Sequence, residues 1–133
     1  MNKIAYTSLN DRQKENYNFH KAAAVLADYG FTSIRLSDDW QGADFIAQHI
    51  DGETFLKIQL KGRMSIAKKY IEKGLHICFP YEGAWYLFPH DEVMNHLLQT
   101  SNIGNTSSWQ EEGLYSFKII SKEYLNYFQK FRL

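Results

Sequence analysis

A stretch of alternating residues between positions 42 and 61 constrains the fold of this chain more than any other segment. Side chains of a strand alternate between the two faces of its sheet. The pair Asp51-Gly52 divides the stretch in two, and Asp-Gly is a preferred sequence for a two-residue type I′ hairpin turn. The stretch therefore predicts a β-hairpin with this turn at its tip.

The predicted turn fixes which residues of the hairpin face one another. Ile50 would pair with Glu53, and Asp44 would then lie opposite Gln59. Lys61 shares a face with Gln59 because one residue separates them. A three-residue loop would instead shift the register by one and move Asp44 to the opposite face. With the two-residue loop, a carboxylate, an amide and an ammonium group meet on one patch. The other face carries the apolar residues Phe45, Ala47, Leu56, Ile58 and Leu60.

A helix is predicted over residues 11–29, ahead of the hairpin. Asn10 and Gln13 form a capping-box sequence at its start, and Gly30 supplies a stop at its end. Glu15 begins a stripe at helical spacing that continues through Phe19, Ala22 and Leu26. This stripe should face the sheet. The acid on it either works with the polar patch of the hairpin or is favoured there by the helix macrodipole.

The remaining chain predicts further strands and helices, and so a mixed α/β fold. Residues 63–74 read as either a crossover helix or an extended loop. The other predicted elements are strands at 75–79 and 85–88 joined by Pro80 to Gly83, a helix from 89 to 98, a surface loop at 101–113, a strand at 115–120, and a C-terminal helix that Ser121 caps and that buries Leu125 and Phe128.

The order of these elements, with four polar residues, resembles the PD-(D/E)XK nuclease superfamily over roughly residues 10 to 90. The core of that superfamily is a helix followed by a β-meander that carries an acid and then a (D/E)-x-K tripeptide. The matching residues are Glu15, Asp44, Gln59 and Lys61. Gln59 stands where an acid is usual, in a Q-x-K form also known in intron-type homing endonucleases, and Ala43 stands where proline is common. The resemblance implies a restriction-endonuclease-like core: an N-terminal helix on a mixed β-sheet, with C-terminal helices.

The resemblance also implies a Mg²⁺ site, with Mn²⁺ as a substitute. Asp44 would be the main ligand, and the Gln59 side-chain oxygen and the Leu60 carbonyl would add neutral ligands. Glu15 would hold a metal-bound water or a second ion, and Lys61 would orient or deprotonate the attacking water. The implied products carry 5′-phosphate and 3′-hydroxyl ends.

The charges of the chain cancel, with 15 basic and 15 acidic residues, but they are unevenly distributed. Residues 57–73 are mainly basic and follow a mainly acidic stretch at 31–56. Contacts to phosphates are expected from Lys57, Arg63, Lys68 and Lys69. The alternative is a solvated lysine-rich surface.

Other features narrow the function. We expect one domain over residues 1–133, because this length is typical of a single domain and the 44% hydrophobic content can build its core. We expect it in the cytoplasm, because the sequence contains neither an apolar run that would cross a bilayer nor a signal-peptide pattern. Cys78 is predicted to be a core residue rather than a nucleophile, and the histidines lack zinc-site spacing. Trp40 and Trp109 each lie in polar surroundings, where the ring either stacks on a base or folds back onto the core.

The sequence as a whole predicts a metal-dependent enzyme that hydrolyses phosphodiester bonds of nucleic acid, a DNA endonuclease. Its expected partner is double-stranded DNA, and a homodimer would present a second site for the second strand. The alternative is a noncatalytic module of the same fold that binds nucleic acid or another protein.

Overall fold

A mixed five-stranded sheet in the order β1-β2-β3-β5-β6 forms the middle of the molecule, with β3 and β5 parallel. This computed structural model describes the backbone of residues 1–133 and every side chain except those of residues 39 and 40. The strands of the sheet are β1 (Phe31–Trp40), β2 (Ala43–His49), β3 (Phe55–Leu60), β5 (Leu75–Tyr81) and β6 (Ala84–Pro89). A second, two-stranded sheet pairs β4 (Ser65–Ala67) with β7 (Leu114–Ser116).

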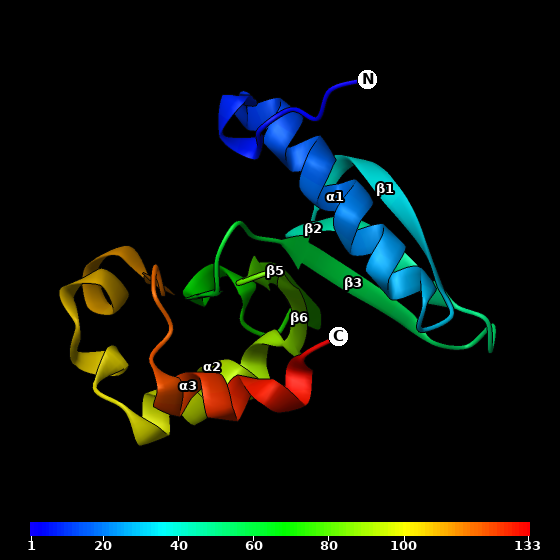
Figure 1. The fold of residues 1–133 in the computed structure, drawn as a ribbon. Coiled ribbons are helices and arrows are strands. Elements are labelled where there is room, and N and C mark those ends of the chain that lie inside the picture. The colour runs from blue at the N-terminus through cyan, green and yellow to red at the C-terminus, as the bar shows by residue number, and fades with distance from the viewer.

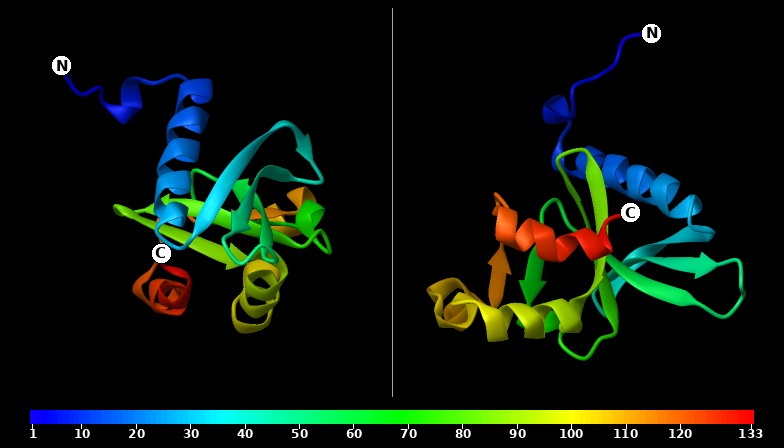
Figure 2. Two further views of the ribbon diagram at one scale, coloured as in Figure 1. Left: turned by 90° about the vertical axis from the view of Figure 1, so that its right-hand side faces the viewer. Right: turned by 60° about the horizontal axis from the view of Figure 1, so that its bottom comes forward.

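Helices cover both faces of the larger sheet. They are α1 (Asp11–Ala27), α2 (His90–Thr100) and α3 (Lys122–Phe128), with short turns η1 (Tyr6–Ser8), η2 (Lys68–Tyr70), η3 (Ile103–Asn105), η4 (Ser108–Glu112) and η5 (Gln129–Phe131). In Figures 1 and 2, α1 lies against one face of the sheet, whereas α2 and α3 lie side by side beyond the other. Within the described part of the chain, no helix is both long enough and apolar enough to cross a bilayer.

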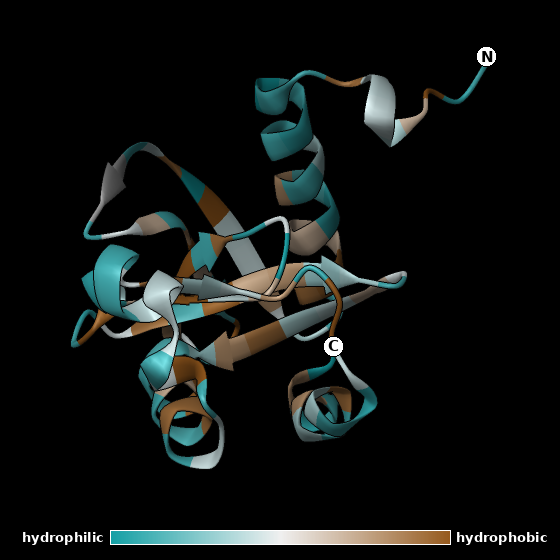
Figure 3. Cartoon of the chain, turned by 90° about the vertical axis from the view of Figure 1, so that its left-hand side faces the viewer, coloured by the Kyte–Doolittle hydropathy of each residue, from teal (hydrophilic) through white to brown (hydrophobic). Residues whose placement is uncertain are grey.

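The start of α1 confirms the predicted capping box. The Asn10 side chain accepts a hydrogen bond from the Gln13 backbone N–H, and the Gln13 side chain accepts one from the Asn10 N–H, both at 2.9 Å. Gly30 follows the helix with a φ of +83°, a conformation that favours glycine. The N-terminal turns of α1 are hydrophilic and its later turns more hydrophobic (Figure 3).

The apolar stripe of α1 and the apolar face of the predicted hairpin pack together, as expected. Their shared core consists of Ala22, Leu26, Phe45, Ala47, Ile58 and Cys78. A larger core lies between the opposite face of the sheet and the C-terminal helices, and includes Ile77, Phe79, Phe88, Leu97 and Phe128. The predicted fold class, an N-terminal helix on a mixed sheet with C-terminal helices, is therefore confirmed.

The register of β2 and β3 is the predicted one, but the predicted turn is wrong. Phe45 lies opposite Ile58, and the pairs continue in step to Gln48 and Phe55. The loop spans residues 50–53 rather than only Asp51-Gly52: His49 N–H donates to the Thr54 carbonyl, and the Ile50 N–H donates to the Gly30 carbonyl, each at 2.9 Å. Gly52 has a positive φ and Asp51 does not, so the turn is not type I′.

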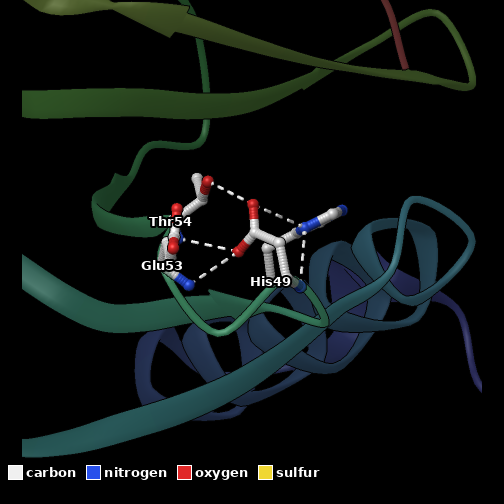
Figure 4. Close-up of polar contacts among 4 residues, drawn as sticks. His49, Glu53 and Thr54 are labelled. Atoms are coloured by element: carbon white, nitrogen blue, oxygen red, sulfur yellow. Dashed lines mark hydrogen bonds and ion pairs between the residues drawn. The ribbon is translucent and has the colours of Figure 1, made fainter.

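The Asp51 side chain explains this longer loop. Its carboxylate accepts hydrogen bonds from the backbone N–H groups of Glu53 and Thr54, each at 2.8 Å, and from the Thr54 hydroxyl at 2.6 Å (Figure 4). These bonds hold the pKa of Asp51 well below its usual range. An aspartate bonded to its own following backbone stabilises a turn without left-handed geometry at the aspartate. The loop gains one residue on each side, so the register is kept.

The segment at 63–74 is not a crossover helix. It contains β4 and η2, and its residues from Met64 to Ala67 are buried. Two contacts attach it to the start of α2: the Ala67 N–H donates to His90 Nε2 at 3.0 Å, and the Glu72 N–H donates to an Asp91 carboxylate oxygen at 2.9 Å. In the segment at 63–74, burial against β7 and α2 outweighs the local preference for a helix.

The C-terminal part follows the prediction with shorter elements. The strand expected at 115–120 is β7, which ends at Ser116 because its partner β4 has only three residues. The loop expected at 101–113 contains the turns η3 and η4. Ser121 caps α3 through the Tyr124 N–H, and Phe128 is fully buried, as predicted.

Candidate active site

A cavity of about 260 Å³ lies beside the N-terminal half of α1, at the start of β2 and the end of β3. Its lining residues are Glu15, Asn18, Phe19, Arg35, Asp44, Gln59, Leu60, Lys61 and Gly62. All five residues predicted for catalysis or metal binding are among them. Since a water occupies about 30 Å³ of liquid, the cavity has room for a phosphate group and several waters.

Asp44 is held where β2 passes between the two cores. Its neighbour Ala43 belongs to the larger core, and its other neighbour Phe45 to the core under α1. One carboxylate oxygen of Asp44 accepts a hydrogen bond from the Leu60 backbone N–H at 2.8 Å. This bond joins β2 to the end of β3 and fixes the carboxylate at the wall of the cavity.

Gln59 is one of the buried polar groups of the candidate site, with 8% of its surface exposed. Its Nε2 lies 3.5 Å from the Leu60 carbonyl oxygen, a long hydrogen bond. Its Oε1 is buried and has no hydrogen-bond partner among the described residues. A buried oxygen without a partner costs about 1–3 kcal/mol, so this side chain carries a cost that its own fold does not offset.

Lys61 continues the chain from β3 along the cavity wall. Its backbone N–H donates to the Cys78 carbonyl at 2.9 Å, which anchors it to β5. Its ammonium nitrogen lies 5.3 Å from the centre of the buried Tyr70 ring, and that of Lys69 lies 5.2 Å from the same ring. The Tyr70 ring therefore holds two cations beside the cavity.

Glu15 reaches the cavity from α1 and is exposed at its mouth. It also lines an adjoining surface pocket with Arg12, Asn16, Arg35, Leu36 and Ser37. The stripe that begins with Glu15 does face the sheet, but only its later members are covered, because the helix extends beyond the strands at this end. The carboxylate is thus placed beside the polar patch of the hairpin.

Sequence reasoning did not assign two polar side chains of the cavity, those of Arg35 and Asn18. Arg35 of β1 lies opposite Phe45, its guanidinium is 5.3 Å from the centre of the Phe19 ring, and its Nη1 donates to the Asn16 side chain. Asn18 is 8% exposed, and its Nδ2 donates to the Tyr6 hydroxyl at 3.0 Å. Strand alternation would have placed Arg35 on the helix-facing side, and helical spacing would have placed Asn18 near Glu15.

The residues predicted to contact phosphates separate into different environments. Lys68 and Lys69 line a pocket that also includes Lys61, so they adjoin the cavity. Arg63 is exposed on the segment after β3. Lys57, by contrast, donates to the Lys73 carbonyl and supports the chain before β5.

The cavity contains an oxygen-rich set of side chains of the kind that Mg²⁺ prefers. The set comprises the Asp44 carboxylate, Gln59 Oε1 and the Leu60 carbonyl, with the Glu15 carboxylate at the mouth. The unpartnered Gln59 oxygen fits such a cation, because binding would give it a partner. Over the described side chains, no group of three or more His, Cys, Asp or Glu residues could hold a metal ion.

Other predicted assignments concern residues away from the cavity. Burial raises the pKa of the Cys78 thiol to about 12, which agrees with a core cysteine. Trp109 is 6% exposed, so its ring is folded onto the core, with the Lys68 ammonium 5.4 Å from its centre. The Trp40 side chain lies outside the described residues.

Comparisons with known proteins yield structural neighbours. No family model matches the sequence, and no curated protein does. The bacterial homing endonuclease I-Ssp6803I matches with a TM-score of 0.50 and 12% identity, over 92% of this chain and 94% of that one. The Holliday junction resolvase Hjc of the archaeal hyperthermophile Archaeoglobus fulgidus matches with a TM-score of 0.46 and 18% identity, over 57% of this chain and 72% of that one. The match to the homing endonuclease supports a nuclease-like fold for this chain.

Proposed function

We propose that this protein is a metal-dependent endonuclease that hydrolyses phosphodiester bonds of DNA. One observation carries the proposal: Glu15, Asp44, Gln59 and Lys61 come from a helix and two strands and line one cavity. The buried Gln59 oxygen without a partner adds support, because it costs stability unless something binds it.

Asp44, Gln59 and the Leu60 carbonyl would hold a Mg²⁺ or Mn²⁺ ion, with Glu15 at the outer side. Such a cation, when bound, offsets charge that develops on a phosphate and makes a coordinated water more acidic. The Leu60 N–H keeps the Asp44 carboxylate oriented through their 2.8 Å hydrogen bond. Asp44, Gln59 Oε1 and the Leu60 carbonyl would together form the oxygen set.

Lys61 would act on the attacking water, either by orienting it or by taking its proton. Its backbone is fixed to β5, and its side chain extends along the Tyr70 ring, so the ammonium group is pre-positioned beside the cavity. Lys68, Lys69 and Arg63 would bind neighbouring phosphates, each neutralised phosphate adding a salt-dependent increment to affinity. A homodimer would place a second site on the opposite strand of a duplex.

The alternative is a noncatalytic module of the same fold that binds nucleic acid or another protein. The neutral amide of Gln59 favours this alternative, because among the described side chains it leaves only Asp44 and the exposed Glu15 as acids lining the cavity. Metal binding distinguishes the two functions. The endonuclease requires a cation at Asp44, whereas the binding module contacts its partner equally well without one.

The decisive experiment is cleavage of supercoiled plasmid and of short single strands in Mg²⁺ or Mn²⁺. Asp44→Asn keeps an oxygen that can accept from Leu60 N–H but removes the charge, and Lys61→Met keeps the length of the side chain. Both variants should abolish cleavage. Glu53→Gln, which removes an exposed carboxylate at the hairpin tip, should cut like wild type. Absence of cleavage together with absence of metal binding would overturn the enzyme and leave the binding module.

A further inference from the structure

Another pocket adjoins the cavity. The two share Asn18 and Gly62 as lining residues, so they are adjacent. The second pocket carries three aromatic residues from separate elements: Tyr6 of η1, Tyr17 of α1 and Trp85 of β6. A molecule that leaves the cavity past Asn18 therefore enters a pocket lined by rings.

Two of these rings form an exposed pair. Tyr6 and Tyr17 have ring centres 5.2 Å apart, with a tilt of 57°, and they remain 38% and 41% exposed. The buried Asn18 side chain donates to the Tyr6 hydroxyl at 3.0 Å, which fixes the Tyr6 ring at the junction with the cavity. More than a third of the surface of each of these two residues therefore remains open to solvent.

Each ring of the pair also carries a lysine. The ammonium nitrogen of Lys14 lies 5.5 Å from the centre of the Tyr6 ring, and that of Lys21 lies 5.4 Å from the centre of the Tyr17 ring. Lys14, Tyr17 and Lys21 share one face of α1, since they are spaced three and four residues apart. Exposed rings with ammonium groups beside them match the two parts of a nucleotide, because a base stacks on a ring and its phosphate pairs with a cation.

We propose that this aromatic pocket, defined by Tyr6, Tyr17 and Trp85, binds the base of an unpaired nucleotide next to the scissile phosphate. The inference rests on the proposed function and adds a substrate class to it: DNA with an unpaired nucleotide beside the cut. In a continuous duplex each base is stacked between its neighbours, so it enters the pocket only at the cost of unstacking. The protein therefore prefers single-stranded or bulged DNA over a continuous duplex.

The test measures binding rather than cleavage. The protein carries Asp44→Asn, so that bound DNA stays intact. Fluorescence anisotropy measures its affinity for three labelled DNAs of one sequence: a continuous duplex, the same duplex with one bulged nucleotide, and the single strand. We expect tighter binding of the bulged and single-stranded DNAs. Adding Tyr17→Ala should weaken those two by roughly tenfold and leave the duplex unchanged. Tyr17→Phe keeps the ring and should bind like the parent.

The outcomes separate this inference from the endonuclease proposal. Equal affinity for all three DNAs would overturn the aromatic pocket. An equal loss of affinity for all three DNAs in Tyr17→Ala would overturn it too. Neither result bears on the endonuclease proposal, which is tested by cleavage with Asp44 intact. If Tyr17→Ala does not fold, Tyr17→Leu retains the apolar bulk without an aromatic face and should show the same selective loss. Absence of binding to every DNA would overturn the aromatic pocket, whereas the endonuclease proposal is decided by cleavage with Asp44 intact.

Discussion

Gln59 is the residue that departs most from an all-carboxylate cation site. It is nearly buried, and its Oε1 has no partner among the described residues. Gln59→Glu introduces a negative charge at the same position, and affinity for a hard cation rises with the charge of its ligands. We expect Mn²⁺ to bind this variant about tenfold more tightly, as measured by calorimetric titration.

The control for this prediction is Phe55→Glu. Phe55 is 55% exposed at the end of β3 far from the cavity, and its replacement does not touch the residues that bond to Asp51. It adds the same charge away from the cavity and should leave Mn²⁺ affinity unchanged. A Gln59→Glu protein with wild-type affinity would show that the Gln59 oxygen is not a ligand.

His90 gives a pH dependence to stability. Burial lowers the pKa of its imidazole, although the hydrogen bond to Asp91 acts in the opposite direction, and burial also lowers the pKa of His76. The unfolded chain binds protons at these histidines with the ordinary pKa of 6.5. Below that pH the unfolded state gains protons that the folded state resists, so the free energy of unfolding should fall as pH drops.

Denaturant unfolding at about pH 7.5 and about pH 5.5 checks this sign. His90→Gln keeps an acceptor for the Ala67 N–H but does not titrate, so its stability should fall less over the same range. The exposed variant His20→Gln is the matched control and should keep the full pH dependence. A wild-type protein that is more stable at the lower pH would contradict the assignment of neutral, buried imidazoles.

At the scale of elements, α1 depends on its capping box. Asn10→Ala removes the side-chain oxygen that accepts the Gln13 N–H, and we expect it to lower the free energy of unfolding by about 1 kcal/mol. The change also loosens the turn that carries Glu15. Thermal and denaturant unfolding measure the loss, and Asn126→Ala, at an exposed position within α3, should cost less. Equal effects of both changes would contradict a specific role for the cap.

The elements that the sequence could predict are those whose signals are local. The capping residues and apolar stripe of α1 lie within one segment, and so does the alternation of β2 and β3. The β2–β3 register was predicted from an Asp-Gly turn that the structure does not contain, and it is correct because the loop takes one residue from each strand. The segment at 63–74 could not be predicted in this way. Its burial depends on β7 and on His90 of α2, both distant in sequence. The meeting of Glu15 with Asp44 was likewise expected only through the family resemblance, because it depends on how α1 docks.

At the scale of the whole molecule, the DNA binding that we propose would have to arise from local rather than net charge, since the formal net charge is zero. Lys68 and Lys69 adjoin the cavity through the pocket that they share with Lys61. Replacing both by glutamine should weaken DNA binding for all sequences and lower the slope of log affinity against log salt by about two. Titrations at several salt concentrations measure that slope.

Two exposed lysines at the opposite end of the chain provide the comparison. Lys118→Gln with Lys122→Gln makes the same change in net charge near the start of α3, away from the cavity. This double variant should keep the wild-type slope. If both double variants lowered it alike, net charge rather than the site around Lys61 would govern binding.

The loop at 50–53 has a consequence for how this chain can diverge over evolution. It includes Ile50 and Glu53, which were predicted to pair, yet the β2–β3 register is unchanged, because the loop takes one residue from each strand. A slip of one strand by a single residue would turn Asp44 away from Gln59. Homologues that keep the candidate site should therefore keep this strand register, whatever the length of the loop between the strands.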